Sequence, residues 1–152
     1  MSLPQSIQPA ITAPSGHAFI NPPGLYDPSP NGYSHVVVAQ APARLVFLAG
    51  QGGETADGRL SPDFAEQVRQ ALRNLQTALH AAQAELAHIT RLTVLVVDHS
   101  PQRLAVLSDS IKALWGEEHP TPACTLIPVP RLALDGMLFE IEAQAVVPTA
   151  DA

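Results

Sequence analysis

The sequence predicts an α+β domain in which two helices pack on one side of a β-sheet. Two segments carry helix-start signals followed by apolar residues at helical spacing. Strand-like runs precede, separate and follow these segments, which gives the order ββαβαββ. The length of 152 residues favours a single domain with one core.

Proline dominates the first part of the chain, with seven of the 15 prolines in the first 30 residues. Proline fixes φ and lacks a backbone donor, so we expect residues 1–20 to form an extended arm rather than part of a sheet interior. Residues 21–148 are predicted to form the domain, and residues 149–152 a C-terminal tail. Asn31-Gly32 suits a turn into the first strand.

Two β-rich runs follow this turn, HVVVAQ at 35–40 and RLVFLAG at 44–50. Their close spacing predicts a hairpin. Gly50, Gly52 and Gly53 then open a loop in which Asp57-Gly58 is a second turn signal. These glycines lack the spacing of a phosphate-binding loop, and we expect them to serve as turn and bulge residues.

The first helix is predicted to start at Ser61. Ser61 suits the N-cap, Pro62 the first helical position and Asp63 the positive end of the helix dipole. One apolar stripe follows at steps of three and four residues, made of Phe64, Val68, Leu72, Leu75, Leu79 and Ala82. We expect Arg69, Arg73 and Gln76, which lie off this stripe, to be solvated.

The second half of the chain repeats these signals. The run RLTVLVVD at 91–98 is typical of a strand covered on both faces. Ser100-Pro101 predicts a second helix start, and Gly116 its end. Strands are predicted at 124–129 and 137–147, and the last one alternates, with Phe139, Ile141, Ala143 and Ala145 on one face and Glu140, Glu142 and Gln144 on the other.

Composition limits the classes of partner. Hydrophobic residues make up 46% and charged residues 14%, which indicates apolar surface covered in a subunit interface. The net charge of -6 and the scattered arginines argue against nucleic acid. A single cysteine, no signal-peptide pattern and no long apolar run lead us to expect a cytoplasmic protein away from membranes.

Few residues have an arrangement that suggests chemistry. Glu140 and Glu142 share a strand face, which suits acid/base work, although acidic strand residues more often face solvent or an interface. Cys124 has no cation closer along the chain than Arg131, so a small space-filling role is favoured over a nucleophile. The six histidines show no metal-ligand spacing, so no metal site is expected. His35 is more suited to a surface role than to a pocket lining.

The segments GYSHVVVA, LVFLAGQGG, DFAEQVRQALRNLQTALHAA, ITRLTVLVVD and TPACTLIPVPRLA…LFEIEAQAVV resemble the Rid family, the YjgF-like reactive intermediate deaminases. This resemblance covers roughly residues 21–148. It implies a chorismate-mutase-like fold, with one mixed sheet and two helices on one face, assembled as a homotrimer with small-molecule clefts between subunits. Members of the best-known branch hydrolyse enamines and imines to a ketoacid and ammonia. The resemblance therefore also implies that this chain holds no cofactor.

The resemblance also assigns roles to residues. Glu140 matches the glutamate that helps hold the attacking water, and Tyr33, Gly50 and Gln51 match the lining of the cleft. The motif P-A-R-[ST], whose arginine grips the substrate carboxylate, reads Pro-Ala-Cys124-Thr125 in this chain. A thiol cannot replace a guanidinium in that contact. Cys124 is therefore expected to shape the pocket, and backbone amides around it remain available to a ligand.

Three functions remain open on these residues. The first is an imine or enamine hydrolase whose substrate lacks the usual carboxylate or presents it to another group. The second is a non-catalytic trimer that binds a small metabolite or a partner enzyme. The third is the endoribonuclease or translation-inhibitor activity attached to some family members, against which the net charge of -6 counts.

Overall fold

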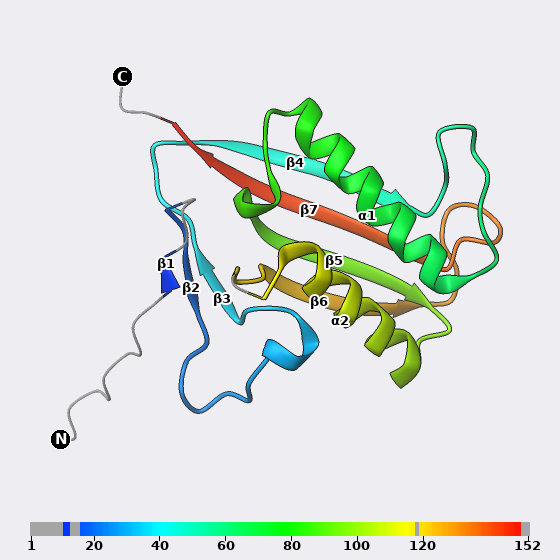
Figure 1. The fold of residues 1–152 in the computed structure, drawn as a ribbon, viewed down its shortest axis with the longest axis horizontal. Coiled ribbons are helices and arrows are strands. Elements are labelled where there is room, and N and C mark those ends of the chain that lie inside the picture. The colour runs from blue at the N-terminus through cyan, green and yellow to red at the C-terminus, as the bar shows by residue number, and fades with distance from the viewer. Residues whose placement is uncertain (1–10, 13–15, 118, 150–152) are drawn as a thin grey trace.

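The computed structural model describes residues 11–12, 16–117 and 119–149, and in it two helices cover one face of a four-stranded sheet (Figure 1). The strand order is β4-β7-β5-β6, formed by β4 (Ala43–Gly52), β5 (Ile89–Val97), β6 (Ala123–Val129) and β7 (Phe139–Pro148). The sheet is mixed, because β5 and β6 run parallel while β7 is antiparallel to both of its neighbours. The α+β prediction, with helices on one face, is confirmed.

A small second sheet lies beside the main one (Figure 1) and consists of β1 (Ile11–Thr12), β2 (Ala18–Ile20) and β3 (Val36–Val38). The predicted hairpin of residues 35–40 with 44–50 is therefore wrong. Val36–Val38 pairs with Ala18–Ile20, whereas β4 pairs with β7. Of the expected arm, Ala18–Ile20 is extended but forms the middle strand of this sheet. Residues 1–10 and 13–15 of the arm and 150–152 of the tail lie outside the described part.

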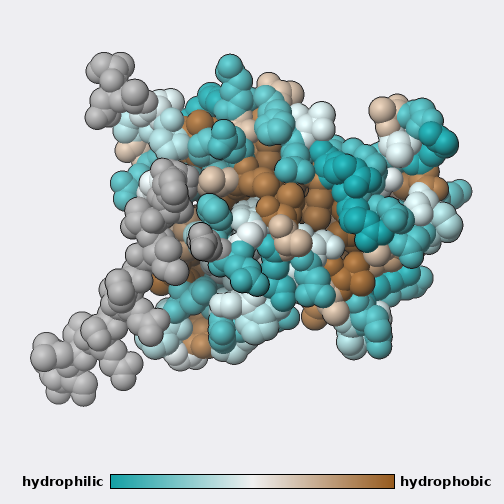
Figure 2. Space-filling model, viewed as in Figure 1, coloured by the Kyte–Doolittle hydropathy of each residue, from teal (hydrophilic) through white to brown (hydrophobic). Residues whose placement is uncertain are grey.

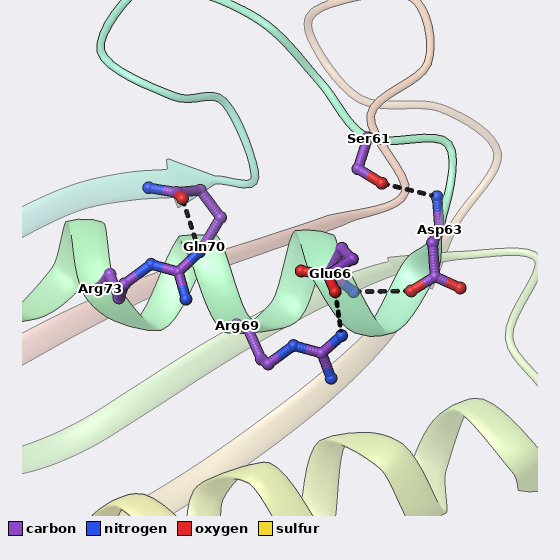
Figure 3. A network of polar contacts seen from close by, with 6 residues as sticks. All are labelled: Ser61, Asp63, Glu66, Arg69, Gln70 and Arg73. Atoms are coloured by element: carbon purple, nitrogen blue, oxygen red, sulfur yellow. Dashed lines mark hydrogen bonds and ion pairs between the residues drawn. The ribbon is translucent and has the colours of Figure 1, made fainter.

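The helix α1 (Phe64–Ala81) begins two residues later than a Ser61 cap would place it. Asp63 is the N-cap, because its side chain accepts a hydrogen bond from the backbone N–H of Glu66 at 2.8 Å (Figure 3). Ser61 accepts instead from the N–H of Asp63 at 3.2 Å, and its predicted capping role is wrong. The members of the apolar stripe that lie within the helix are buried, as predicted. They are Phe64, Val68, Leu72, Leu75 and Leu79.

The outer side of α1 is polar. Arg69 donates to Glu66 and Arg73 donates to Gln70, at 2.6 and 2.7 Å (Figure 3). Both arginines are exposed, as expected, whereas Gln76 is half-buried. In Figure 2 hydrophilic residues cover much of this side of the molecule, and hydrophobic residues are visible between the helices.

The second helix, α2 (Pro101–Trp115), matches its prediction at both ends. Ser100 accepts from the N–H of Arg103 at 3.2 Å, and Pro101 is the first helical residue. Gly116 ends the helix with φ of 80°, in the region that favours glycine. Two short 3-10 turns, η1 (Ser29–Asn31) and η2 (Leu86–His88), complete the elements of the described residues. The turn η1 ends at Gly32, with φ of 74°, at the predicted turn.

The main core lies between the helices and the sheet. The alternation of β7 is confirmed, since Phe139, Ile141, Ala143 and Ala145 are all buried in this core. In β5, Leu92 and Val94 are buried, whereas Thr93 and Leu95 on the other face are only half-buried. Coverage of both faces of β5 is therefore not achieved within a single chain.

The face of the main sheet that points away from the helices is here called the outer face. Its apolar side chains include Phe47, Leu45 and Ile127, with exposed fractions of 73, 62 and 43%. Glu142 and Gln144 of β7 project from the same face. Among the described residues, no helix combines the length and the apolar character that a membrane crossing requires.

Candidate functional site

Glu140 lies on the outer face near one end of the sheet. It is paired with Gly52 on β4 and with Leu95 on β5. Its carboxyl group leans over Gly50, where a Cβ atom would come within 2.6 Å of the Cδ of Glu140. Only glycine leaves this space free, so Gly50 allows the carboxyl group to pack directly against the strand.

Gln51 follows Gly50 at an irregularity in β4. The pairing register between β4 and β7 shifts between Leu48 and Gln51, as expected of a bulge. Gln51 is paired with Ile141, and its side-chain Nε2 donates to the carbonyl of Ala49 at 3.1 Å. The predicted cleft residues Gly50 and Gln51 thus adjoin Glu140 on the neighbouring strand.

The surroundings of Glu140 favour its neutral form. Burial raises the pKa of the Glu140 carboxyl above its usual value of 4.5, and the negative charges of Glu54 and Glu142 raise it further. A carboxyl with a raised pKa can carry a proton at a pH where ordinary glutamates are ionised. Glu140 is therefore suited to proton transfer.

Glu54 was not among the residues singled out from the sequence. Its carboxyl group packs over Gly52, and its Oε2 atom is buried without a hydrogen-bond partner in the described structure. The sequence feature that could have pointed to Glu54 is the pair Gly50 and Gly52, which leaves space beside two neighbouring positions of one strand. Such glycines in a strand mark places where another group approaches closely.

Tyr33 lies at a different place, beside the start of β6. Ser34 forms a bridge with Ala123, and its backbone N–H donates to the carbonyl of Pro122 at 3.0 Å. The Ser34 hydroxyl also donates to the carbonyl of Thr121 at 2.6 Å. These bonds hold the Tyr33 backbone against the strand that carries Cys124 and Thr125.

The Tyr33 ring belongs to an aromatic cluster that the sequence did not reveal. Its hydroxyl is hydrogen-bonded to that of Tyr26, and its ring packs edge-on against His35 at a centroid distance of 5.5 Å. His35 also packs against Tyr26 at 5.2 Å, and its Nε2 bonds to the Tyr26 carbonyl at 2.8 Å. Tyr33 is therefore held in place from two sides.

A cavity of about 870 Å³ adjoins this cluster. Tyr33, Ser34 and Thr121 line one part of it, and Lys112 and Asp109 of α2 line another. Lys112 is ion-paired with Asp109 at 3.4 Å. The size is within the range of small-molecule sites.

Cys124 and Thr125 point to opposite faces of β6. Cys124 is paired with the buried Leu92 and packs against the main core, whereas Thr125 is exposed and paired with Thr93. Burial raises the pKa of the Cys124 thiol from 9.0 to about 11. Cys124 is therefore a neutral thiol at physiological pH.

Within one chain, the residues around Glu140 (Gly50 and Gln51) do not meet Tyr33, which lies beside the start of β6. Across the sheet Glu140 aligns through Leu95 with Ile127, whereas Tyr33 adjoins the strand near Ala123. This separates Glu140 from Ala123 by about 13 Å along the strands and about 10 Å across them. Within the described residues, no group of three or more His, Cys, Asp or Glu side chains is arranged to hold a metal ion.

Comparison with known proteins identifies the family to which the chain belongs. The sequence model of the family described as Endoribonuclease L-PSP matches residues 27–147. The chain belongs to this family, which is the YjgF/Rid family. The resemblance carried by the GYS, GQ and EIEA segments is thereby confirmed.

Individual members of the Rid family are clearly similar. The chain is 35% identical to the RutC family protein YjgH of Escherichia coli K12 over 104 residues, which cover 68% of this chain and 76% of that protein. The structure of the Rid family protein YyfB from Yersinia pestis, described as of unknown function, matches with a TM-score of 0.80 and 38% identity, covering 86% of this chain and 98% of that one. Rv2704 from Mycobacterium tuberculosis matches with a TM-score of 0.58 and 30% identity, covering 86% and 99%.

Proposed function

We propose that this Rid-family protein hydrolyses an imine or enamine of a small metabolite in clefts between the subunits of a homotrimer. The observation that carries this proposal is the carboxyl group of Glu140. It lies over Gly50 on the outer face, and its pKa is raised by burial and by Glu54 and Glu142. A carboxyl group with this position and a raised pKa can position a water molecule and exchange a proton with it.

The separation of the two groups of residues supports assembly between subunits. Glu140 and Gly50 are far from Tyr33 within one chain, so we expect one small ligand to reach both groups only if they come from different subunits. The apolar outer face, with Phe47 exposed at 73%, supplies the surface for such an association. Each cleft would combine Glu140 of one subunit with Tyr33 of its neighbour.

The chemistry needs one water molecule and no cofactor. The water oxygen forms a bond to the imine carbon, and a proton reaches the nitrogen. The resulting carbinolamine then loses ammonia as its C–N bond breaks and a carbonyl forms. Glu140 holds the water and transfers the proton between oxygen and nitrogen.

The substrate differs from that of the best-known branch. Cys124 is a neutral thiol packed against the core, so it supplies neither a cation nor a nucleophile. A carboxylate would lack the bidentate contact that a guanidinium gives. We propose that the substrate lacks this carboxylate or presents it to another group.

A coupled assay tests the activity. A pyridoxal-phosphate dehydratase generates 2-aminoacrylate or 2-aminocrotonate. Condensation of a carboxylate-free aldehyde with an amine, with loss of water, supplies further imines, and carbonyl release is followed. We expect the wild type to accelerate release, Glu140→Gln to lose about 100-fold of this effect, and the exposed control Glu142→Gln to stay within a few-fold. Equal rates for wild type and Glu140→Gln on every imine contradict the proposal.

The buried Cys124 thiol favours a second candidate, a trimer that binds a small metabolite without converting it. Cys124→Arg separates the two. If neither the wild type nor Cys124→Arg accelerates imine hydrolysis, and the wild type still binds a carbonyl compound in calorimetry, the binding function holds. Recovery of hydrolysis in Cys124→Arg alone shows an intact hydrolytic scaffold with a different native substrate.

The family description as an endoribonuclease is not extended to this chain. The net charge of -6 opposes the binding of a phosphate backbone. Filter binding at low ionic strength checks this point, and we expect no retention of RNA. Salt-sensitive retention would reopen the ribonuclease activity.

A further inference from the structure

The loop that follows β4 is fixed by the helix α1. The side-chain Nδ2 of Asn74 donates to the carbonyl of Gly52 at 3.0 Å and to that of Glu54 at 2.8 Å. The backbone at Glu54 is thereby tied to the rigid part of the domain. The Glu54 side chain accordingly starts from a defined position.

From this position the Glu54 carboxyl group folds back over Gly52. A Cβ atom at Gly52 would lie 3.3 Å from the Cδ of Glu54 and 2.5 Å from the Cε of Met137. Gly52 is the residue paired with Glu140 on β7, and paired residues of antiparallel strands project to the same face. Glu54 and Glu140 therefore lie on the same face, over two neighbouring glycine positions of β4.

The charge of Glu54 is not neutralised by a bonded partner. Its Oε2 atom is buried and has no hydrogen-bond partner in the described structure. The arginines of the adjoining loops are ion-paired elsewhere, Arg59 with Asp57 at 2.7 Å and Arg131 with Asp135 at 3.2 Å. The other charged group acting on Glu140 is Glu142 of the same strand, which is exposed.

We propose that Glu54 is a positioning residue whose carboxyl group, held over Gly52 beside Glu140, favours the protonated form of Glu140. A carboxylate next to a second carboxyl group disfavours ionisation of that second group. The Glu140 pKa, raised first by burial and then by Glu54, agrees with this geometry. The catalytic consequence rests on the function proposed above: protonated Glu140 can donate its proton to the nitrogen that leaves as ammonia.

Titration of the glutamate side chains tests the inference without any substrate. Carbon-13 labelling of the glutamate carboxyl groups allows each to be followed by NMR, with the Glu140 signal assigned from its loss in Glu140→Gln. We expect Glu54→Gln to lower the titration midpoint of Glu140, and the matched control Glu142→Gln to lower it less. An unchanged midpoint in Glu54→Gln, or an equal drop in Glu142→Gln, overturns the inference.

Two further measurements keep the outcome decisive. Thermal unfolding verifies that Glu54→Gln is folded, and Glu54→Ala takes its place if it is not. For an active wild type, the rate falls as pH rises through the Glu140 pKa, and Glu54→Gln moves this fall to lower pH. If the wild type hydrolyses no imine, the proposed function fails, and the NMR midpoints still decide the role of Glu54.

Discussion

The carboxyl group of Glu140 occupies the space that a side chain at position 50 would need. A Cβ atom at Gly50 would come within 2.6 Å of the Glu140 Cδ. The glycine on β4 and the glutamate on β7 therefore form one structural unit. The position of the proposed acid/base group depends on a residue that has no functional group of its own.

The substitution Gly50→Ala is expected to slow hydrolysis without unfolding the domain. The added methyl group displaces the Glu140 carboxyl group, which is the flexible end of a half-buried side chain. In the coupled imine assay we expect a loss of about 100-fold, similar to that of Glu140→Gln. Ala49→Ser, at the exposed neighbouring position, serves as the control. Full activity of Gly50→Ala would show that the carboxyl position is unimportant.

The Cys124 thiol is expected to react slowly with alkylating reagents. Its pKa of about 11 lies above the ordinary value of 9.0, and only the thiolate reacts. At pH 8 this difference lowers the thiolate fraction about 100-fold, and the reactivity rises as the pH approaches 11. Iodoacetamide modification followed by mass spectrometry measures the rate, with the urea-unfolded chain as reference. Equal rates in the two states would contradict the buried, neutral thiol.

The start of α1 can be tested by removing each of its two candidate caps. Asp63 accepts from the backbone N–H of Glu66 at 2.8 Å, whereas Ser61 only accepts from the N–H of Asp63. We expect Asp63→Ala to lower the free energy of unfolding by about 1 kcal/mol. Ser61→Ala should lower it by less. A larger loss for Ser61→Ala in urea unfolding would restore Ser61 as the cap.

The outer face is expected to hold the trimer together through Phe47. This side chain is exposed at 73% in the single chain and sits beside Leu45 and the polar Gln144. Phe47→Asp should weaken association by about 2 kcal/mol or more, because buried aromatic residues dominate interface energies. Light scattering should give a trimer for the wild type and for Arg73→Glu on the helix side, and a smaller species for Phe47→Asp. A wild-type monomer would refute the assembly.

The parts of the fold that the sequence predicted are those with local causes. Ser100-Pro101 and Gly116 bound α2 because caps and turns act within a few residues, and the alternation of β7 needs only one covered face. The predicted pairing of β3 with the next strand was wrong, because Val36–Val38 and Ala18–Ile20 meet through tertiary contacts that neither segment encodes alone. Asp63 and Ser61 are both good caps, and only the structure shows which one bonds.

In the candidate site, too, some residues were identified from the sequence and others only from the structure. Glu140, Gly50 and Tyr33 were identified by resemblance, and the structure shows how Gly50 and Glu140 pack together. Glu54 was not identified from the sequence because its contribution depends on tertiary contacts. Asn74 holds the loop, and the Glu54 carboxyl group folds back over Gly52. The distance between Glu140 and Tyr33 depends on strand order, which local patterns do not contain.

Subunit complementation tests most directly whether each site combines Glu140 of one subunit with Tyr33 of its neighbour. Glu140→Gln and Tyr33→Ala are each expected to lose imine hydrolysis when they form a trimer alone. Co-expression in equal amounts places both intact residues at about a quarter of the sites, because each site draws independently on two subunits of a symmetric ring. Recovery of about a quarter of the wild-type rate is the predicted result. A mixed trimer no more active than the separate variants would contradict the shared site.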